Sequence, residues 1–145
     1  MKEETAESWT RDSVTGDRYT GRPVYVLTSA ATFGAAEELA YALQAQRRAL
    51  VVGERSGGRA NTSATLPVGG GFIAFLPTGR AVNPVTKTSW EGVGVKPDLA
   101  VPAPLAVRAA HLAALTVLVQ GERDLDRRLS LQQVLAQLRR GSRTK

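Results

Sequence analysis

A helix enclosed by two short apolar runs constrains the fold of this chain more than any other feature. Residues 24–27 (Val-Tyr-Val-Leu) and 49–52 (Ala-Leu-Val-Val) are continuous apolar runs, which are typical of strands buried on both faces of a parallel sheet. Residues 34–47 between them are rich in alanine and leucine, with Glu37 and Glu38 in the first turn and arginine at the end. That charge order suits the dipole of a helix. The pattern predicts a βαβ unit and therefore an α/β protein.

The chain after this unit contains a predicted hairpin and a third short strand. Residues 62–66 and 72–76 are β-forming runs joined by a turn that contains three glycines, and such a pair favours a hairpin. Residues 98–101 predict a further strand. Residues 105–119 are apolar nearly all round, so we expect a buried helix there and buried packing for its histidine, His111.

Three parts are expected along the chain. Residues 1–22 are polar and lack periodicity, which predicts an arm or linker. Residues 23–120 would form the core. Residues 121–145 contain a stripe of apolar residues that follows Ser130 at helical spacing and ends near basic residues, so they predict an amphipathic helix with a basic tail.

Composition excludes several classes of protein. The 145 residues include no cysteine, which excludes a disulfide scaffold, a thiolate zinc site and a cysteine nucleophile. No cluster of histidine and acidic residues has the spacing of metal ligands, and the glycine-rich pieces match no phosphate loop or dinucleotide fingerprint, so no cofactor and no metal are expected. The polar N-terminus has no apolar segment typical of a signal peptide, and the apolar stretch 109–119 is too short to span a bilayer. We therefore expect the chain as given to be soluble, while its localisation stays open.

The net charge of +6 raises nucleic-acid binding as one interpretation. The basic residues are scattered and concentrate only toward the C-terminus, and the few aromatic residues do not alternate with them. A stacking platform for bases needs that alternation. We therefore expect a solvated basic face, with a basic interaction protein as the weakest of three hypotheses.

The turn between the first strand and the helix is the first candidate site. Residues 28–38 read TSAATFGAAEE. A buried strand that turns directly into a helix places unpaired backbone N–H groups at the positive end of the helix dipole. This geometry suits an oxyanion hole beside a nucleophile. Every βαβ unit has such a turn, however, so the geometry alone leaves a purely structural role open.

The residues of this turn resemble the nucleophile segment of the tail-specific (C-terminal processing) serine peptidases, in particular the branch related to interphotoreceptor retinoid-binding protein. In that segment Thr32 and Phe33 precede the position of the catalytic serine, and Ala35 and Glu37 follow it. The pair Gly-Glu at 53–54 also matches. The most specific likeness lies in two longer motifs, PTGRAVNPV at 77–85 and WEGVGVKPD at 90–98. The resemblance extends over about residues 23–119.

The resemblance implies a crotonase-like or ClpP-like βαβ superhelix, of which this chain would hold only the C-terminal part. It also implies peptide hydrolysis by a serine whose proton is taken by a lysine, or by a histidine within a Ser-His-Ser-Glu set. A serine hydroxyl needs such a base because its own pKa is far too high.

Transferred residue by residue, the resemblance fails at the reacting groups. The serine position holds Gly34, which has no hydroxyl. The position of the base holds Arg59, and a guanidinium stays protonated at any working pH. The backbone N–H of Ala35 occupies the oxyanion position. Glu91 matches the acidic member of the four-residue set, with a loop carboxylate paired to a nearby arginine or lysine as the alternative.

Ser29 and Thr32 lie in the same turn, but neither has an evident base. We expect both hydroxyls to hydrogen-bond the backbone of the turn or of the helix start.

Two principal hypotheses follow. In the first, the chain is a peptidase-like domain that is inactive because of Gly34 and Arg59. In the second, it is a non-catalytic module that binds apolar ligands or peptide tails, and the candidate binding residues are Thr32, Phe33, Phe72, Phe75 and Trp90.

The expected ligand is a peptide or an apolar molecule. We also expect a protein partner, either a second copy of the chain or a chain that supplies the missing half of the domain, because a partial sheet exposes its edge strands. Nucleic acid and membranes are not expected partners.

Overall fold

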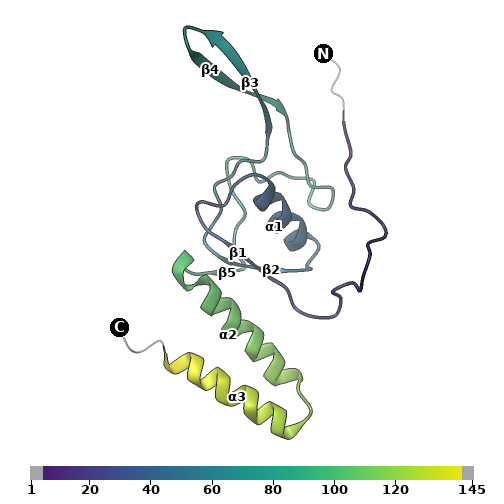
Figure 1. Ribbon diagram of the computed structural model, residues 1–145, viewed down its shortest axis with the longest axis vertical. Coiled ribbons are helices and arrows are strands. Elements are labelled where there is room, and N and C mark those ends of the chain that lie inside the picture. The colour runs from purple at the N-terminus through teal and green to yellow at the C-terminus, as the bar shows by residue number, and fades with distance from the viewer. Residues whose placement is uncertain (1–4, 142–145) are drawn as a thin grey trace.

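The computed structural model describes residues 5–141. These residues form three helices and five strands (Figure 1). In chain order the elements are β1 (Tyr25–Thr28), α1 (Ala35–Ala45), β2 (Leu50–Gly53), β3 (Thr62–Gly69), β4 (Phe72–Gly79), β5 (Leu99–Ala100), α2 (Ala103–Gly121) and α3 (Leu125–Arg140). The predicted order of strands and helices is therefore confirmed, with ends that differ by a few residues.

The centre of the molecule is a parallel sheet of three strands in the order β1-β2-β5. Val26 of β1 lies opposite Val51 of β2, and Val52 lies opposite Leu99 of β5. The βαβ prediction is confirmed, since β1 and β2 pair in parallel across α1. Burial on both faces is confirmed for Val51 and Val52 of β2, but it is wrong for Leu27 of β1, which is 42% exposed, and for Leu50 at the start of β2, which is 48% exposed. In so small a sheet, β1 is an edge strand and no element covers it fully.

Successive residues of β2 supply the cores on the two faces of the sheet, because side chains alternate along a strand. Val51 packs with Ala40 of α1 and with Trp90 and Val95. Val52 packs with Ala106 and Ala110 of α2. The result is an α/β/α arrangement in which α1 lies on one side of the sheet and α2 on the other (Figure 1).

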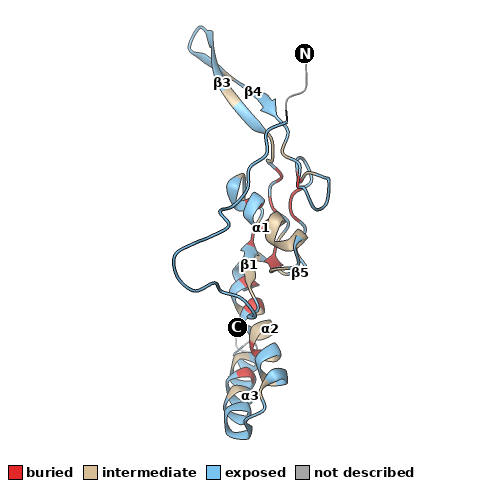
Figure 2. Ribbon diagram, turned by 90° about the vertical axis from the view of Figure 1, so that its right-hand side faces the viewer, coloured by how far each residue is buried: buried red, intermediate tan, exposed pale blue. Residues whose placement is uncertain are grey.

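Strands β3 and β4 form an antiparallel hairpin that projects from the body of the protein (Figure 2). Thr65 lies opposite Phe75, and Pro67 lies opposite Ile73. Within the hairpin every residue is exposed except Ala64 and Ala74, which are half-buried. We refer to residues 62–79 as the arm.

Helices α2 and α3 form a second antiparallel pair on the far side of the sheet from the arm (Figure 1). Asp124 begins α3 by accepting a hydrogen bond from the backbone N–H of Arg127 at 2.8 Å, a normal N-cap. The predicted burial of α2 was wrong, since Val107 is 67% exposed and His111 is exposed. The helix packs the sheet with one side and α3 with another, and no described residue covers the remainder.

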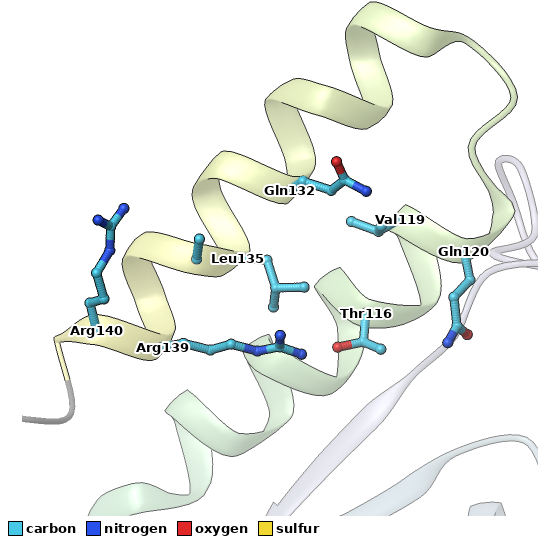
Figure 3. A pocket seen from close by; sticks show the side chains of 8 residues that line it. Thr116, Val119, Gln120, Gln132, Leu135, Arg139 and Arg140 are labelled. Carbon is cyan, nitrogen blue, oxygen red and sulfur yellow. The ribbon is translucent and has the colours of Figure 1, made fainter.

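By length and composition α2 would suffice to cross a membrane. The core helix of a water-soluble protein meets the same criteria. The groove between α2 and α3, about 740 Å³ in volume, is lined by Thr116, Val119, Gln120, Gln132, Leu135, Ala136, Arg139 and Arg140 (Figure 3). None of these residues belongs to the turn that precedes α1.

Candidate functional site

The turn between β1 and α1 is held by its own hydroxyl groups. The backbone N–H of Ser29 donates to Oγ1 of Thr32 at 3.0 Å, and the N–H of Ala31 donates to Oγ of Ser29 at 3.2 Å. The Thr28 hydroxyl donates to the carbonyl of Glu54 at 2.7 Å. Both candidate hydroxyls, Ser29 and Thr32, thus bond the backbone of the turn, as expected from the sequence. Neither contacts a histidine or lysine in the part of the chain that the structure describes.

Gly34 ends this turn and is the N-cap of α1, with φ 59° and ψ −126°. Residues other than glycine rarely adopt a positive φ of this kind, and when they do the strain costs about 1–3 kcal/mol. The serine of a nucleophile elbow likewise sits on a strained turn from a strand into a helix. A Cβ atom built on Gly34 would have no heavy atom within 4 Å. The backbone therefore has room for a side chain that the sequence does not provide.

The first N–H groups of α1 are available to a ligand. Glu37 and Glu38 donate their backbone N–H groups to the carbonyl of Gly34. Within residues 5–141, the N–H groups of Ala35 and Ala36 have no hydrogen-bond acceptor. Unpaired N–H groups at a helix start attract an anion or a polarised carbonyl oxygen. The assignment of the Ala35 N–H to an oxyanion position stays a prediction.

Glu37 organises the turn although its side chain is fully buried. Its Oε2 accepts hydrogen bonds from the N–H groups of Gly34 (3.1 Å) and Arg59 (2.9 Å). Its Oε1 accepts from the hydroxyl of Ser56 (2.5 Å) and the N–H of Gly58 (2.7 Å). One carboxylate thus joins the start of α1 to the loop that follows β2.

Burial by itself would raise the pKa of Glu37, since it penalises the charged form. The hydrogen bonds from Ser56 and from the backbone of Arg59, Gly58 and Gly34 outweigh burial and hold the pKa below its ordinary value. Glu37 is therefore ionised at neutral pH. A carboxylate with all four bonds filled within the protein serves as a structural anchor and has no free lone pair directed at a substrate.

Ser56 extends this network to a third segment. Its hydroxyl accepts from the N–H of Val95 at 2.7 Å, and its own N–H donates to the carbonyl of Val95 at 3.2 Å. Gly94 lies so close that a Cβ there would stand 2.1 Å from the carbonyl oxygen of Ser56. Neither Glu37 nor Ser56 was identified as a site residue from the sequence. The spacing of a glutamate three residues after the N-cap is the signal that points to Glu37.

Arg59 lies over Phe33, the residue before Gly34. Its guanidinium carbon stands 4.6 Å from the centre of the Phe33 ring, within the range of a cation–π contact. The same ring leaves no space beside Gly57, where a Cβ would stand 1.6 Å from a ring carbon. Arg59 thus lies beside Phe33, the residue before Gly34, and the side chains of Arg59 and Phe33 are both exposed.

Glu91 fixes the backbone at the end of the loop between β2 and β3. Its Oε2 accepts from the N–H groups of Ala60 at 2.6 Å and Asn61 at 2.8 Å. No arginine or lysine of the described residues forms an ion pair with it. No hydrogen bond joins Glu91 to the turn that contains Gly34 in residues 5–141.

Comparison with known proteins decides the family. The profile of Peptidase family S41 matches residues 1–101, well over half of the chain. This chain belongs to peptidase family S41. The tail-specific peptidase resemblance is thereby confirmed.

A carboxy-terminal-processing protease of Bartonella bacilliformis is 34% identical over 94 residues, which is 65% of this chain and 21% of that protein. Among solved structures, a photosystem II D1 C-terminal processing protease is similar, with 26% identity and a TM-score of 0.44 over 57% of this chain and 21% of that one. The S41 chain described here therefore spans about a fifth of the length of each. The mixed α/β class agrees with the family, whereas the crotonase-like or ClpP-like superhelix stays a prediction.

The second long motif of this S41 chain forms part of the core beside α1. Trp90 is only 4% exposed, and its ring lies 5.1 Å from that of Tyr41. The Tyr41 hydroxyl hydrogen-bonds the hydroxyls of Thr86 (3.1 Å) and Thr88 (2.7 Å). The segment 83–95 thus packs against the helix that begins at Gly34.

The aromatic residues proposed for ligand binding do not form one surface. Trp90 lies in the core, while Phe72 and Phe75 are 73% and 74% exposed on the arm. Phe33, 41% exposed, and Thr32 remain at the turn beside Gly34. No group of three or more histidine, cysteine or acidic side chains in the described residues could hold a metal ion.

Proposed function

We propose that this S41 chain binds peptide tails at the N-terminus of α1 and does not hydrolyse them. The single observation that supports the proposal is Gly34, which has the backbone of a nucleophile elbow and no side chain. Covalent peptide hydrolysis starts when a hydroxyl oxygen attacks the scissile carbonyl carbon while a base accepts its proton. Gly34 provides no oxygen, and the guanidinium of Arg59 accepts no proton.

The groups that bind are retained. The free N–H groups of Ala35 and Ala36 can donate to a carbonyl or carboxylate oxygen. Phe33 offers an exposed ring beside them, and Arg59 places a positive charge over that ring. An apolar side chain followed by a carboxylate is the chemistry that these groups complement. The relative from Bartonella is described as a carboxy-terminal-processing protease, so a peptide with a free carboxyl end is the natural ligand to test.

A restoration experiment tests the absence of hydrolysis. The purified chain and its Gly34→Ser and Gly34→Ser/Arg59→Lys variants are incubated with fluorogenic peptides that have free C-termini, and separately with a fluorophosphonate that labels activated serine. We expect no turnover and no labelling by the unmodified chain. Serine alone should add little, because the base position still holds arginine, and any gain should be largest in the double variant.

Gly21→Ser is the matched control, since Gly21 also has a positive φ of 70° with no heavy atom within 4 Å of a built Cβ. It should remain unlabelled and inactive. Robust hydrolysis by the unmodified chain that disappears in Thr32→Val or Ser29→Ala would contradict the proposal.

A second candidate function is the binding of apolar ligands such as retinoids or fatty acids, which the exposed ring of Phe33 favours. The chain has two tryptophans, so Trp9→Phe leaves Trp90 as the only indole fluorophore. We expect peptide tails to quench the fluorescence of Trp90 saturably, because its neighbour Glu91 bonds the backbone of the loop that contains Arg59. Phe33→Ala should weaken this quenching. Saturable quenching by retinoids alone would favour the second function. Quenching by neither ligand at micromolar concentration would count against both.

A further inference from the structure

Helix α3 has two rows of side chains at alternating spacings of three and four residues, the spacing of a coiled-coil seam. The inner row is Leu131, Leu135 and Leu138. Leu135 is 7% exposed and lines the groove toward α2 (Figure 3), and the other two leucines are half-buried. The inner row therefore packs against α2. The outer row is Leu125, Leu129, Gln132 and Ala136.

Within residues 5–141, the outer row stays exposed. Leu125 is 58% exposed and Leu129 is 47% exposed, and Gln132 and Ala136 are exposed as well. The spacing of the row places these four side chains along one side of the helix. The 16 residues of α3 extend over about 24 Å. A stripe this narrow and straight fits a second helix.

Two charged residues flank the outer row symmetrically. Asp126 lies seven residues before Gln133, and Arg140 lies seven residues after it. Seven residues are close to two helical turns, so all three lie on the same flank of α3. Within residues 5–141, neither Asp126 nor Arg140 forms an ion pair, and Arg140 points away from α2 (Figure 3). An antiparallel copy of α3 around a two-fold axis near Gln133 would therefore meet each aspartate with an arginine.

We infer that two copies of this chain associate through their α3 helices, which lie antiparallel around that axis. Asp126 of each copy then pairs with Arg140 of the other. Leu129 faces Ala136 of the other copy, a large side chain against a small one, and the two Gln132 amides meet near the axis. An isologous contact needs such a self-complementary surface, and a single polar residue in the seam fixes the register of coiled coils.

The charges of α3 select both the antiparallel orientation and the partner. Parallel helices would place Asp126 against Asp126 and Arg140 against Arg140, and like charges in contact oppose association. A nucleic acid or an anionic membrane would attract Arg140 but repel Asp126 on the same flank. A second copy of α3 satisfies both residues.

Charge reversal tests the pairing directly. The mass of the unmodified chain, of Asp126→Arg and of Arg140→Asp is measured by sedimentation over a range of micromolar concentrations, for each variant alone and for an equimolar mixture of the two. We expect the unmodified chain to dimerise and each variant alone to have a dissociation constant at least about tenfold higher, because both pairs become repulsive. The mixture should recover the dimer, since a mixed pair again brings opposite charges together at both positions.

Leu129→Glu tests the apolar part of the outer row. It places a carboxylate where Leu129 would face Ala136 of the other copy, so we expect a monomer. The far-ultraviolet circular dichroism should stay unchanged, since Leu129 is already 47% exposed. Val107→Glu is the matched control, because Val107 is 67% exposed on α2, and it should remain dimeric.

The absence of native cysteine permits a further measurement. A single thiol is introduced as Gln132→Cys or, for comparison, as Val107→Cys, and intermolecular disulfide formation is followed under mild oxidant. Thiols held together near the two-fold axis react at a high effective concentration, so cross-linking at position 132 should be at least about tenfold faster than at position 107.

The inference fails if the unmodified chain is monomeric throughout, if the dimer survives Leu129→Glu, or if the two charge variants associate no better together than alone. A monomer that binds duplex DNA or anionic vesicles, and loses that binding in Arg140→Asp, would assign α3 to that partner and would also overturn the inference. None of these results depends on peptide binding at Gly34, so the inference and the proposed function can fail separately.

Discussion

The loop after β2 and the arm are both rich in glycine, yet their surroundings are opposite. In the loop, Gly58 is buried and donates its N–H to the carboxylate of Glu37. In the arm, Gly69, Gly70 and Gly71 form an exposed turn at the tip of a hairpin that contacts little beyond its own two strands. A single buried carboxylate therefore makes one glycine-rich segment part of the core, while the other is held only by its hydrogen-bond ladder. Substitutions that remove the contacts of the loop should therefore destabilise the fold more than substitutions in the arm.

The largest expected effect is the loss of the Glu37 carboxylate. In Glu37→Gln, an amide NH₂ replaces one acceptor oxygen and, in either orientation, faces at least one backbone N–H group, which can only donate. Leaving such buried groups unpaired should lower the free energy of unfolding by about 3 kcal/mol. Urea unfolding followed by circular dichroism measures the change. Glu38→Gln is the control, because Glu38 is exposed in the same turn; equal losses in the two variants would contradict the anchoring role.

The second prediction concerns acid. The folded-state pKa of Glu37 lies below its reference value of 4.5, so its ionised form stabilises the fold fully above the unfolded pKa. That contribution declines as the pH falls from about 4.5 through the folded pKa, where the folded state also takes up the proton. The free energy of unfolding should thus fall with acid in the unmodified chain and fall less in Glu37→Gln. Parallel pH profiles would refute this assignment.

The third prediction concerns Ser56. Its hydroxyl donates to Glu37 and accepts from the N–H of Val95, and Ser56→Ala removes both bonds while leaving the backbone in place. The expected loss is about 2 kcal/mol in the free energy of unfolding. Ser63→Ala, on the exposed arm, should change it by less than about 0.5 kcal/mol. A negligible loss at Ser56 would mean that the loop is held without its hydroxyl.

The smallest effect on the free energy of unfolding is expected from a substitution in the arm. Truncating Leu66 to alanine should change the free energy of unfolding by less than about 0.5 kcal/mol, since the side chain is nearly half exposed and touches no core. Amides of the arm should exchange hydrogen much faster than those of β2. Protection of the arm equal to that of β2 in this variant would show that the arm belongs to the cooperative body.

Much of the local structure could be predicted from the sequence. The runs 24–27 and 49–52 correspond to β1 and β2, and the alanine-rich segment between them corresponds to α1. The position of Gly34 at the start of that helix also followed from the order of strand, turn and helix. These features depend on periodicity and propensity, which act over a few neighbouring residues.

Burial and side-chain partners could not be predicted in the same way. The apolar composition of α2 predicted a buried helix, but Val107 and His111 are exposed because no described element covers that side. Trp90, a candidate for ligand contact, is only 4% exposed and packs on Tyr41, and its contact with a ligand stays a prediction. Exposure depends on which distant segments meet, and hydropathy along the chain carries no information about that.

The turn at Gly34 illustrates both kinds of information. The sequence by itself determined that position 34 has no hydroxyl and that position 59 holds a guanidinium, because these are properties of single residues. Only the tertiary structure decided how the turn is held, through a carboxylate at Glu37 that accepts bonds from a loop some twenty residues later. The residue at a position determines which chemical groups are available there, whereas long-range packing determines which distant groups they contact.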